Sequence, residues 1–163
     1  MLIGLLSDTH DRLDATIAGV RVLREAGAEF FLHGGDVGGE RILDVFAGDK
    51  AAFVFGNNDW DRRELARYAE KIGVQCLEEF GEITLAGKRF AVTHGDDNAR
   101  LKRIQNDQRD DYLITGHTHL KRDERVGKIR WINPGALYRA REKTVAILDP
   151  VSDILKFLSV DVR

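Results

Sequence analysis

The chain has 163 residues, of which 43% are hydrophobic and 32% are charged, and its formal net charge at pH 7 is −2. This length corresponds to about one domain with a sizeable core, and the apolar content argues against a disordered chain. The small net charge excludes a general electrostatic attraction to nucleic acid or acidic membranes, and the single cysteine, Cys76, excludes an intrachain disulfide.

The chain starts with MLIGLLSDTH, which has no basic leader and only a short apolar run. Such a run is too short for a signal peptide or a membrane span. No repeat, low-complexity tract or linker is visible, so we expect a single domain over residues 1–163. One cysteine is compatible with a reducing compartment, and the cytoplasm is the expected location.

The first half of the chain alternates between strand and helix patterns. Apolar runs that end in polar residues predict strands at residues 2–8, 28–36 and 51–59. Amphipathic patterns that end at a glycine predict helices at residues 12–27, 40–48 and 61–73. This order implies parallel strands joined by right-handed crossovers.

The second half has a different character, because hairpin patterns dominate it. Hairpins are predicted at residues 82–96, 123–135 and 143–160. A helix at 97–107 and a strand at 111–119 lie between the first two hairpins. Parallel α/β units followed by antiparallel hairpins favour two stacked sheets with helices on the outside.

Five apolar segments each run directly into a polar loop marked by glycine, and these segments are LLSDTH (5–10), FLHGGD (31–36), FVFGNND (53–59), FAVTHGD (90–96) and YLITGHTH (112–119). Parallel strands of one sheet end at the same edge, so we expect the first three loops to meet. The other two join them if their strands end on the same rim. Together the loops carry two carboxylates, one amide and four imidazoles: Asp8, His10, Asp36, Asn57, His94, His117 and His119.

The spacing within two of these loops also has a geometric meaning. Asp8 and His10 are two residues apart, and so are His117 and His119. Residues at this spacing on an extended backbone point to the same side. We therefore expect each pair to direct both side chains towards one metal ion or towards two adjacent ions.

Oxygen and nitrogen ligands without a thiolate argue against an all-oxygen calcium site and suit transition metals. Seven ligands are too many for one tetrahedral site, and they favour two ions that share a bridging carboxylate. The expected cofactors are two divalent metal ions, with manganese first and nickel, zinc, iron, cobalt or magnesium as alternatives.

Five short blocks resemble, in order and spacing, the motifs of the calcineurin-like metallophosphoesterases: DTH (8–10), GGDV (34–37), GNND (56–59), THGD (93–96) and GHTH (116–119). The short chain and the segment NPGA (133–136) resemble the small prokaryotic phosphodiesterase branch of that family. The resemblance implies an α/β fold in which two stacked mixed sheets form a β-sandwich flanked by helices, a four-layer αββα arrangement.

The same resemblance implies a role for each ligand. It assigns Asp8, His10 and His119 to a first metal and Asn57, His94 and His117 to a second, with Asp36 bridging the two.

One position departs from the family pattern. The family often has a histidine at position 58 that donates a proton to the leaving group, whereas this chain has Asn58. An amide cannot act as a general acid, although it can hydrogen-bond a phosphate oxygen. Members of the small branch often lack this histidine too. The candidate catalytic residues are therefore Asp36, Asn58 and His94.

The resulting hypothesis is hydrolysis of a phosphate ester, with a diester favoured, by in-line attack of a metal-bridging hydroxide. Two divalent ions, two carboxylates and one hydroxide leave about one positive charge, which favours an anionic phosphoryl group. The alternatives are a phosphomonoesterase or nucleotidase with the same metal core, a nuclease, and a non-catalytic scaffold such as the membrane-coat subunit that has this fold in eukaryotes. The expected partner is a small phosphate ester, and no binding to membranes is expected. Nucleic acid is disfavoured because no basic stripe is evident in the sequence. The sequence leaves open whether the chain forms a homo-oligomer.

Several neighbouring residues have simpler interpretations. We expect His33 to orient the Asp36 loop, Asp59 to brace the Asn57 loop and Cys76 to be buried and inert. Asp96 and Asp97 are typical helix-start residues. The remaining candidates for the pocket rim or for contact with a substrate phosphate are Trp60, Tyr138, Arg139 and Arg141; for Trp60, packing in the interior is the alternative.

Overall fold

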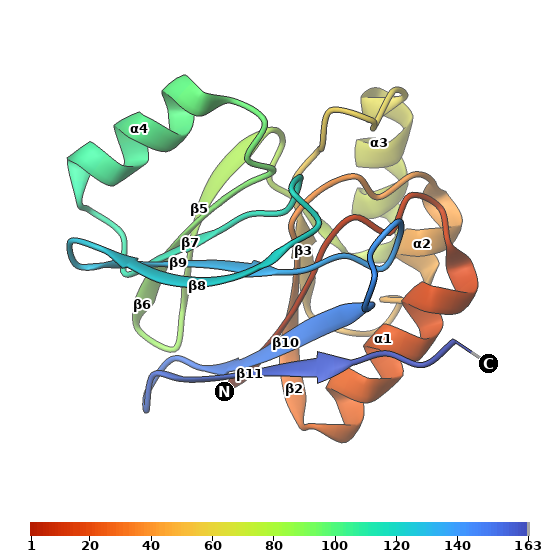
Figure 1. The fold of residues 1–163 in the computed structure, drawn as a ribbon. Helices are drawn as coiled ribbons and strands as arrows, with labels where there is room; N and C mark the ends of the chain where they lie inside the picture. The colour runs from red at the N-terminus through yellow and green to blue at the C-terminus, as the bar shows by residue number, and fades with distance from the viewer. Residues whose placement is uncertain (163) are drawn as a thin grey trace.

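The computed structural model describes residues 1–162, which form two stacked β-sheets with helices on both outer sides (Figure 1). The first sheet has six strands in the order β11-β10-β1-β2-β3-β4. They are β1 (Leu2–Leu6), β2 (Ala28–His33), β3 (Ala51–Phe53), β4 (Gln75–Cys76), β10 (Thr144–Asp149) and β11 (Ile154–Ser159). Strands β1 to β4 pair in parallel, whereas β10 and β11 are antiparallel to their neighbours.

The second sheet has five strands in the order β5-β6-β7-β9-β8. They are β5 (Phe80–Leu85), β6 (Lys88–Thr93), β7 (Tyr112–Ile114), β8 (Lys121–Val126) and β9 (Ile129–Pro134). The pairs β6–β7 and β7–β9 are parallel, and the two hairpin pairs are antiparallel. Both sheets are therefore mixed, as predicted.

The four helices of residues 1–162 cover the outer faces of the two sheets, as Figure 1 shows. They are α1 (Leu13–Glu25), α2 (Glu40–Asp44) and α3 (Arg62–Ile72) against the first sheet and α4 (Asn98–Asp107) against the second. Two helices begin at an aspartate: Asp61 accepts a hydrogen bond from the amide of Glu64, and Asp97, one of the two predicted helix-start residues, accepts one from the amide of Arg100.

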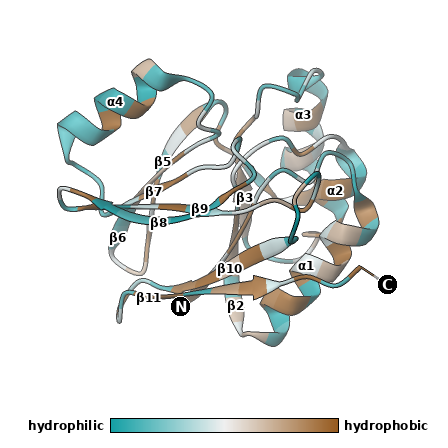
Figure 2. Cartoon of the chain, viewed as in Figure 1, coloured by the Kyte–Doolittle hydropathy of each residue, from teal (hydrophilic) through white to brown (hydrophobic). Residues whose placement is uncertain are grey.

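Three separate apolar clusters fill the spaces between the four layers. Leu6 belongs to the cluster with α1, α2 and α3, whereas its neighbour Leu5 belongs to the cluster between the sheets. A third cluster joins Leu113 of β7 to Leu101 and Ile104 of α4. Figure 2 shows β2 and β10 largely in hydrophobic residues, which follows because the first sheet is covered on both faces. The predicted αββα arrangement is confirmed.

The observed strands are shorter than the predicted ones, and the difference is informative. The segment predicted as strand 2–8 leaves the sheet after Leu6, and the segment predicted as strand 111–119 leaves it after Ile114. The residues that follow are loops that carry the polar side chains. Strand β4 was not predicted, because two residues have too little pattern to detect. Across residues 1–162, no helix combines the length and the apolar character that crossing a membrane requires.

Candidate metal centre

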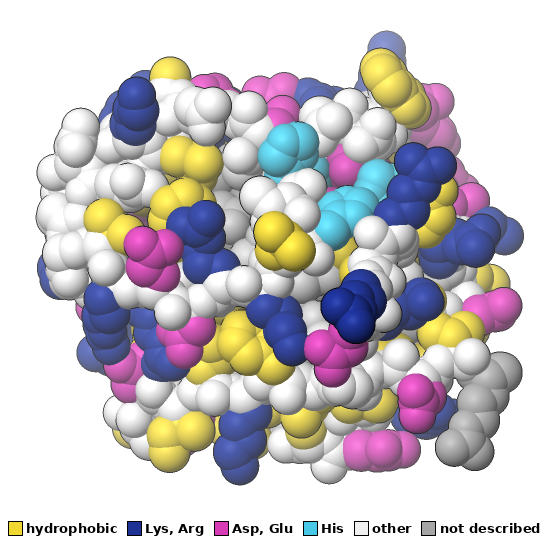
Figure 3. Space-filling model, in the orientation of Figure 1, with side chains coloured by type: hydrophobic (Ala, Val, Ile, Leu, Met, Phe, Trp, Pro, Cys, Tyr) yellow, Lys and Arg dark blue, Asp and Glu magenta, His cyan; other side chains and the backbone are white. Residues whose placement is uncertain are grey.

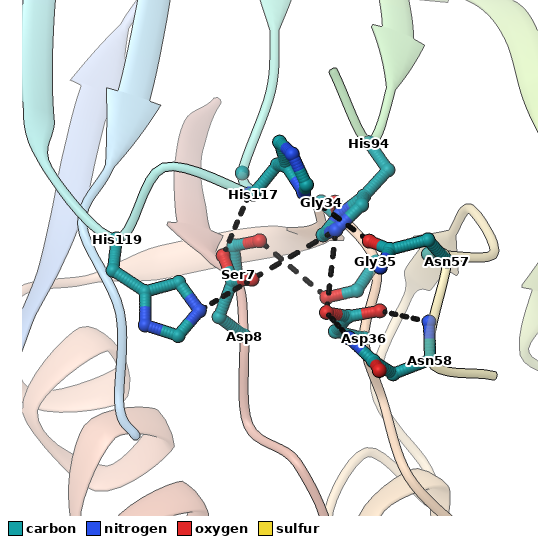
Figure 4. Close-up of polar contacts among 12 residues, drawn as sticks. Ser7, Asp8, Gly34, Gly35, Asp36, Asn57, Asn58, His94, His117 and His119 are labelled. Atoms are coloured by element: carbon teal, nitrogen blue, oxygen red, sulfur yellow. Dashed lines mark hydrogen bonds and ion pairs between the residues drawn. The ribbon is translucent and has the colours of Figure 1, made fainter. Parts of the chain in front are cut away.

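Five loops converge at the carboxyl ends of β1, β2, β3, β6 and β7 and bring the predicted ligands together. Figure 4 labels Asp8, Asp36, Asn57, His94, His117 and His119, and His10 joins them through its contact with Asp36. Backbone hydrogen bonds tie these loops to one another. The amide of Asp8 donates to the carbonyl of Gly35 at 3.0 Å, and the amide of Gly116 donates to the carbonyl of His94 at 2.9 Å. The expectation that the later loops share the rim of the first three is met.

The ligand atoms lie in close contact. The Nε2 atom of His119 is 3.2 Å from Oδ1 of Asp8, and Nδ1 of His117 is 3.2 Å from Oδ1 of Asn57. Nε2 of His10 is 3.2 Å from Oδ2 of Asp36. The same oxygen lies 3.3 Å from Nε2 of His94, so Asp36 lies between histidines that approach it from two different loops. Metal–ligand bonds of about 2.1 Å bring neighbouring ligand atoms to separations of about this size.

Three of these ligand atoms are buried without a hydrogen-bond partner in the part of the chain that the structure describes, and this bears on whether the site fits a cation. Oδ1 of Asp8, Nε2 of His10 and Nε2 of His94 are buried and have no hydrogen-bond partner among residues 1–162. Buried polar atoms without partners are rare in native proteins and need a specific reason. Within the described chain, two sets of potential ligands have atoms within 4.8 Å of one another, Asp8 with His10 and His119, and Asp8 with Asp36 and His94. The residues fit divalent cations bound through oxygen and nitrogen.

The backbone at the site is unusual. Five of the seven predicted ligands have positive φ, a region that non-glycine residues rarely occupy, and they are Asp8 (54°), His10 (43°), Asp36 (55°), His117 (69°) and His119 (58°). The predicted reason for convergence, an extended backbone, is therefore wrong for both histidine-containing pairs, because the chain turns sharply at these residues instead. Such conformations cluster at functional sites, where the surrounding structure holds them in place.

Glycine is required at two positions because the loops approach so closely. A Cβ atom at Gly56 would collide with the backbone nitrogen and Oδ1 of Asp36. A Cβ atom at Gly116 would collide with Oγ of Ser7 and would lie 2.6 Å from Oδ2 of Asp8. These glycines allow the third and fifth loops to pack against the two carboxylates.

A second set of contacts holds the ligands. Nδ1 of His94 donates to the carbonyl of Gly34 at 2.8 Å, which directs Nε2 towards the carboxylates. Asn58 donates to Asp36 twice, from its backbone amide to Oδ1 and from its side chain to Oδ2, each at 2.8 Å. Asp59 is buried and accepts hydrogen bonds from the amides of Val37, Gly38 and Gly56, as expected for a bracing residue.

His33 joins the first two loops. Its Nδ1 accepts from the amide of Gly35 at 3.1 Å, and its Nε2 lies 3.0 Å from Oγ1 of Thr9, whose hydroxyl donates to the carbonyl of Val37. Burial lowers the pKa of His33 to about 4, so the ring is neutral at physiological pH. This matches its predicted orienting role.

The carboxylates and His94 influence one another strongly. Burial tends to raise the pKa of Asp8, but its interactions with His10 and His119 outweigh that effect and hold it well below its usual range. Burial acts in the same way on Asp36, where contacts with His94 and Asn58 lower the net pKa. For His94, burial lowers the pKa, and the contact with Asp36 and the charge of Asp8 more than offset this and raise it to about 9. Both carboxylates are thus ionised at neutral pH, as metal ligation requires.

The structure also shows where residues proposed for the pocket rim or for contact with a substrate phosphate lie. Trp60 is 86% exposed, so the alternative that it packs in the interior is wrong. The ring of Tyr138 lies 4.8 Å from the ring of His10, and Arg139 has its guanidinium 5.1 Å from the Tyr138 ring. Cys76 is only partly buried, so the prediction that it is buried is wrong. Its partial burial raises the pKa of the thiol, which favours the unreactive protonated form.

One functional neighbour had no assigned role in the sequence. Asn133 is buried, and its side-chain amide donates to the carbonyl of Gly116 at 2.7 Å and to Oγ1 of Thr118 at 3.2 Å. It therefore holds the loop that carries His117 and His119. The NPGA segment (133–136) resembles a family branch, but no local pattern in it indicates contact with this loop.

The surface view shows that the centre is open on one side. Figure 3 shows histidine side chains at the surface with basic side chains beside them. His117 is exposed and His10 and His119 are partly exposed, whereas Asp8, Asp36 and His94 are buried. A ligand can thus approach the histidine side of the centre from solvent.

Comparison with known proteins gives consistent matches along the chain. The profile of the calcineurin-like phosphoesterase superfamily domain matches residues 1–153. Phosphodiesterase MJ0936 of Methanocaldococcus jannaschii is 29% identical over 154 residues, which cover 91% of this chain and 93% of that protein. A solved structure described as a novel archaeal phosphodiesterase has a TM-score of 0.91 at 26% identity, covering 98% of this chain and 100% of that one. The Escherichia coli phosphoesterase YfcE has a TM-score of 0.68 at 21% identity, covering 99% of this chain and 100% of that one.

Proposed function

The chain belongs to the calcineurin-like phosphoesterase superfamily, and from this we propose that it is a phosphodiesterase with a dinuclear metal centre built from the seven converging side chains. Membership identifies it as a metal-dependent phosphoric ester hydrolase. The finer points, which concern the number of metals, the ligand roles and the substrate, form the proposal.

The observation that carries the proposal is the position of Asp36. Its Oδ2 atom lies 3.2 Å from Nε2 of His10 and 3.3 Å from Nε2 of His94. In the proposed arrangement Asp8, His10 and His119 hold one ion, and Asn57, His94 and His117 hold the other. Asp36 therefore contacts one histidine from each proposed ligand set, and a carboxylate in this position would be suited to bridge the two ions.

Two divalent cations bound there would lower the pKa of water and balance the charge of a phosphoryl group. The chain contributes two carboxylates to the ligand set, while its imidazoles and Asn57 bind as neutral ligands. The centre therefore keeps a net positive charge that favours an anionic ester. The exposed side chains of His117 and Asn57 leave the second ion position accessible to substrate.

Asn58 has a defined place in this scheme. One of the two hydrogens of its side-chain amide is donated to Asp36, which holds that carboxylate in orientation. The second hydrogen has no acceptor among residues 1–162 and is free to bind a phosphate oxygen. Because an amide cannot protonate a leaving group, we expect esters with good leaving groups, and diesters above monoesters, to be the better substrates.

We expect manganese to support activity best, with nickel, zinc, iron, cobalt and magnesium as weaker alternatives. The curated relative and the solved structure that are each named as a phosphodiesterase support the choice of a diester. A chain with one cysteine is suited to the cytoplasm, where we expect it to act on small phosphate esters.

The test is a substrate panel run with manganese, nickel, zinc and magnesium in turn. It sets bis(p-nitrophenyl) phosphate beside p-nitrophenyl phosphate, a cyclic nucleotide and a short nucleic acid, and the metal content of the protein is measured in parallel. We expect about two metals per chain and the highest kcat/KM for the aryl diester. A higher value for the monoester would favour a phosphomonoesterase, and two bound metals without any hydrolysis would favour a scaffold.

A further inference from the structure

A second group of cationic side chains lies directly beside the metal centre. We propose that Arg12, Tyr138, Arg139 and Lys143, here called the arginine subsite, bind a second anionic group of the substrate. This inference rests on the proposed phosphodiesterase function and narrows its substrate class. The preferred substrate is a small phosphodiester that carries a further phosphate on one of its ester arms.

Tyr138 connects the arginine subsite to the metal centre. Its ring contacts the ring of His10: the two ring centroids are 4.8 Å apart and the ring planes meet at 45°. The guanidinium carbons of Arg12 and Arg139 lie 5.4 Å and 5.1 Å from the same ring. Each guanidinium is therefore within about 10 Å of a predicted metal ligand, a distance that a linker of a few bonds spans.

The charge of the subsite is not balanced by neighbouring acids. The four residues line a hollow of about 570 Å³ together with Arg41, Asp11 and Asp14. Arg41 is engaged by two hydrogen bonds to the carboxylate of Asp11. By contrast, Arg12, Arg139 and Lys143 have no carboxylate within 4.0 Å among the described residues, so the hollow keeps an excess of positive charge.

The arrangement also keeps the arginine donors available. A guanidinium over an aromatic ring is attracted by the ring without using its N–H groups as hydrogen-bond donors. Neither Arg12 nor Arg139 donates a side-chain hydrogen bond to any residue from 1 to 162. The N–H groups of these two guanidiniums are free to donate, and a phosphate monoester accepts bidentate hydrogen bonds from such groups.

The surface has the shape and charge for a small ligand. Figure 3 shows basic side chains beside the histidines, with acidic side chains close to them lower on the same face. The acidic neighbours interrupt any continuous basic stripe, and such a stripe is what binding along a nucleic acid backbone requires. A ligand with one phosphoryl group at the metals and one at the arginines fits this pattern better than a polymer.

The experiment uses two substrates that differ by one phosphate. Thymidine 5′-(p-nitrophenyl phosphate) and its 3′-phosphorylated form release the same leaving group, so the ratio of their kcat/KM values isolates the second anion. In the metal-loaded wild-type protein we expect the 3′-phosphate to raise kcat/KM about tenfold, the effect of two or three exposed charge-assisted contacts. In the double variant Arg12→Gln/Arg139→Gln we expect the ratio to fall to about one.

A matched control carries the same kind of charge change elsewhere. Arg103→Gln removes an exposed arginine on α4, which packs against the other sheet, and it should leave the ratio at its wild-type value. Binding is measured without turnover by equilibrium dialysis of thymidine 3′,5′-bisphosphate and thymidine 5′-monophosphate. We expect the bisphosphate to bind about tenfold more tightly to the wild type and to lose that advantage in the double variant.

Each other outcome has a distinct meaning. Equal kcat/KM values for the two nucleotides in the wild type, with both hydrolysed, overturn the arginine subsite and leave the phosphodiesterase proposal intact. No hydrolysis of either compound with any metal overturns the phosphodiesterase proposal, and the dialysis then decides the subsite alone. Faster cleavage of a short single-stranded oligonucleotide than of the 3′-phosphorylated nucleotide assigns the arginines to nucleic acid and also overturns the proposal.

Discussion

The backbone amide of His117 donates a hydrogen bond to Oδ2 of Asp8 at 3.1 Å, across 109 positions of the sequence. This contact joins the loop after β7 to the loop after β1 and thereby connects the two sheets at the metal centre. It also occupies Oδ2 of Asp8, whereas the buried Oδ1 atom has no hydrogen-bond partner among residues 1–162 and lies 3.2 Å from Nε2 of His119. This leaves Oδ1 available for the metal ligation proposed above.

Replacing a central ligand should remove both metal and activity. We expect Asp36→Asn and His94→Ala to lower kcat/KM for the aryl diester by at least about hundredfold and to reduce the bound metal, since each change removes a buried ligand. Metal content by mass spectrometry and a rate assay check this. Asp96→Asn, an exposed change near the same loop, should keep both properties. Full activity of both ligand variants in the presence of a chelator would reject the metal centre.

Asn58 should affect all leaving groups alike. Asn58→Ala removes the hydrogen bond from the side chain to Asp36, and we expect a loss of about ten- to hundredfold in kcat/KM. Because an amide does not donate a proton, the loss should not depend on the leaving-group pKa. Rates for a series of aryl diesters should give two parallel lines for wild type and variant. A loss that grows as the leaving group becomes poorer would contradict this role.

Metal binding should release protons. In the metal-free protein the pKa of His94 is raised to about 9, so the ring is charged at pH 7, whereas a metal ligand must be a neutral imidazole. As the pH falls below that pKa, metal affinity should fall by about tenfold per unit for the one proton displaced. Activity should also decline below about pH 6, where ordinary histidines become protonated. Calorimetric titration in two buffers with different ionisation enthalpies measures the protons released, and a value of zero at pH 7 would be inconsistent with this account.

Gly56→Ala should disrupt the proposed metal centre by steric collision, without removing a ligand. The new Cβ atom would meet the backbone of Asp36, which cannot move aside as a flexible side chain could, so we expect loss of metal and of about 1–3 kcal/mol in the free energy of unfolding. Gly39→Ala is the control, because its Cβ atom would meet only the Asp11 side chain, at 3.1 Å, and its φ of −167° suits any residue. Urea unfolding and metal content report both effects. Similar stability of the two variants would show that the close approach is not required.

The acid dependence of stability should include a contribution from Asp123. Its carboxylate receives two hydrogen bonds from Arg130, and this contact lowers the pKa of Asp123 in the folded protein. A lowered pKa means that the unfolded chain binds the proton more tightly. The contribution is therefore present above the unfolded pKa of about 4 and is lost as the pH falls through the folded value. Urea unfolding at several pH values should show a smaller acid loss for Asp123→Asn than for the wild type, and identical curves would refute it.

The convergence of the seven predicted ligands could be anticipated because their chemistry and their positions agree. Each lies in the polar loop that follows an apolar run, as His94 does two positions after FAV, and strand ends in parallel sheets meet at one edge. The fold class followed from the change from alternating units to hairpins. The extents of the strands did not, since the chain leaves the sheet at Leu6 and turns at Asp8 with φ of 54°, a conformation that non-glycine residues rarely adopt and that the surrounding contacts hold in place.

The contacts around the ligands could not be predicted in the same way. His33 and Thr9 are 24 positions apart and meet only because β1 and β2 pair side by side. Tyr138 reaches His10 from a loop near the end of the chain, and Asn133 reaches Gly116 from the neighbouring strand β9. Such pairs depend on the register of strands, and no local pattern in the sequence encodes that register.

The origin of the ligands in both sheets has a consequence for how the protein matures. Strands β1, β2 and β3 supply three loops from one sheet, and β6 and β7 supply the other two, so neither half of the sandwich contains a complete ligand set. A folding intermediate in which only one sheet has formed would bind cations weakly and at the wrong stoichiometry. The proposed ions would then bind tightly only after the two sheets have packed together in their native register.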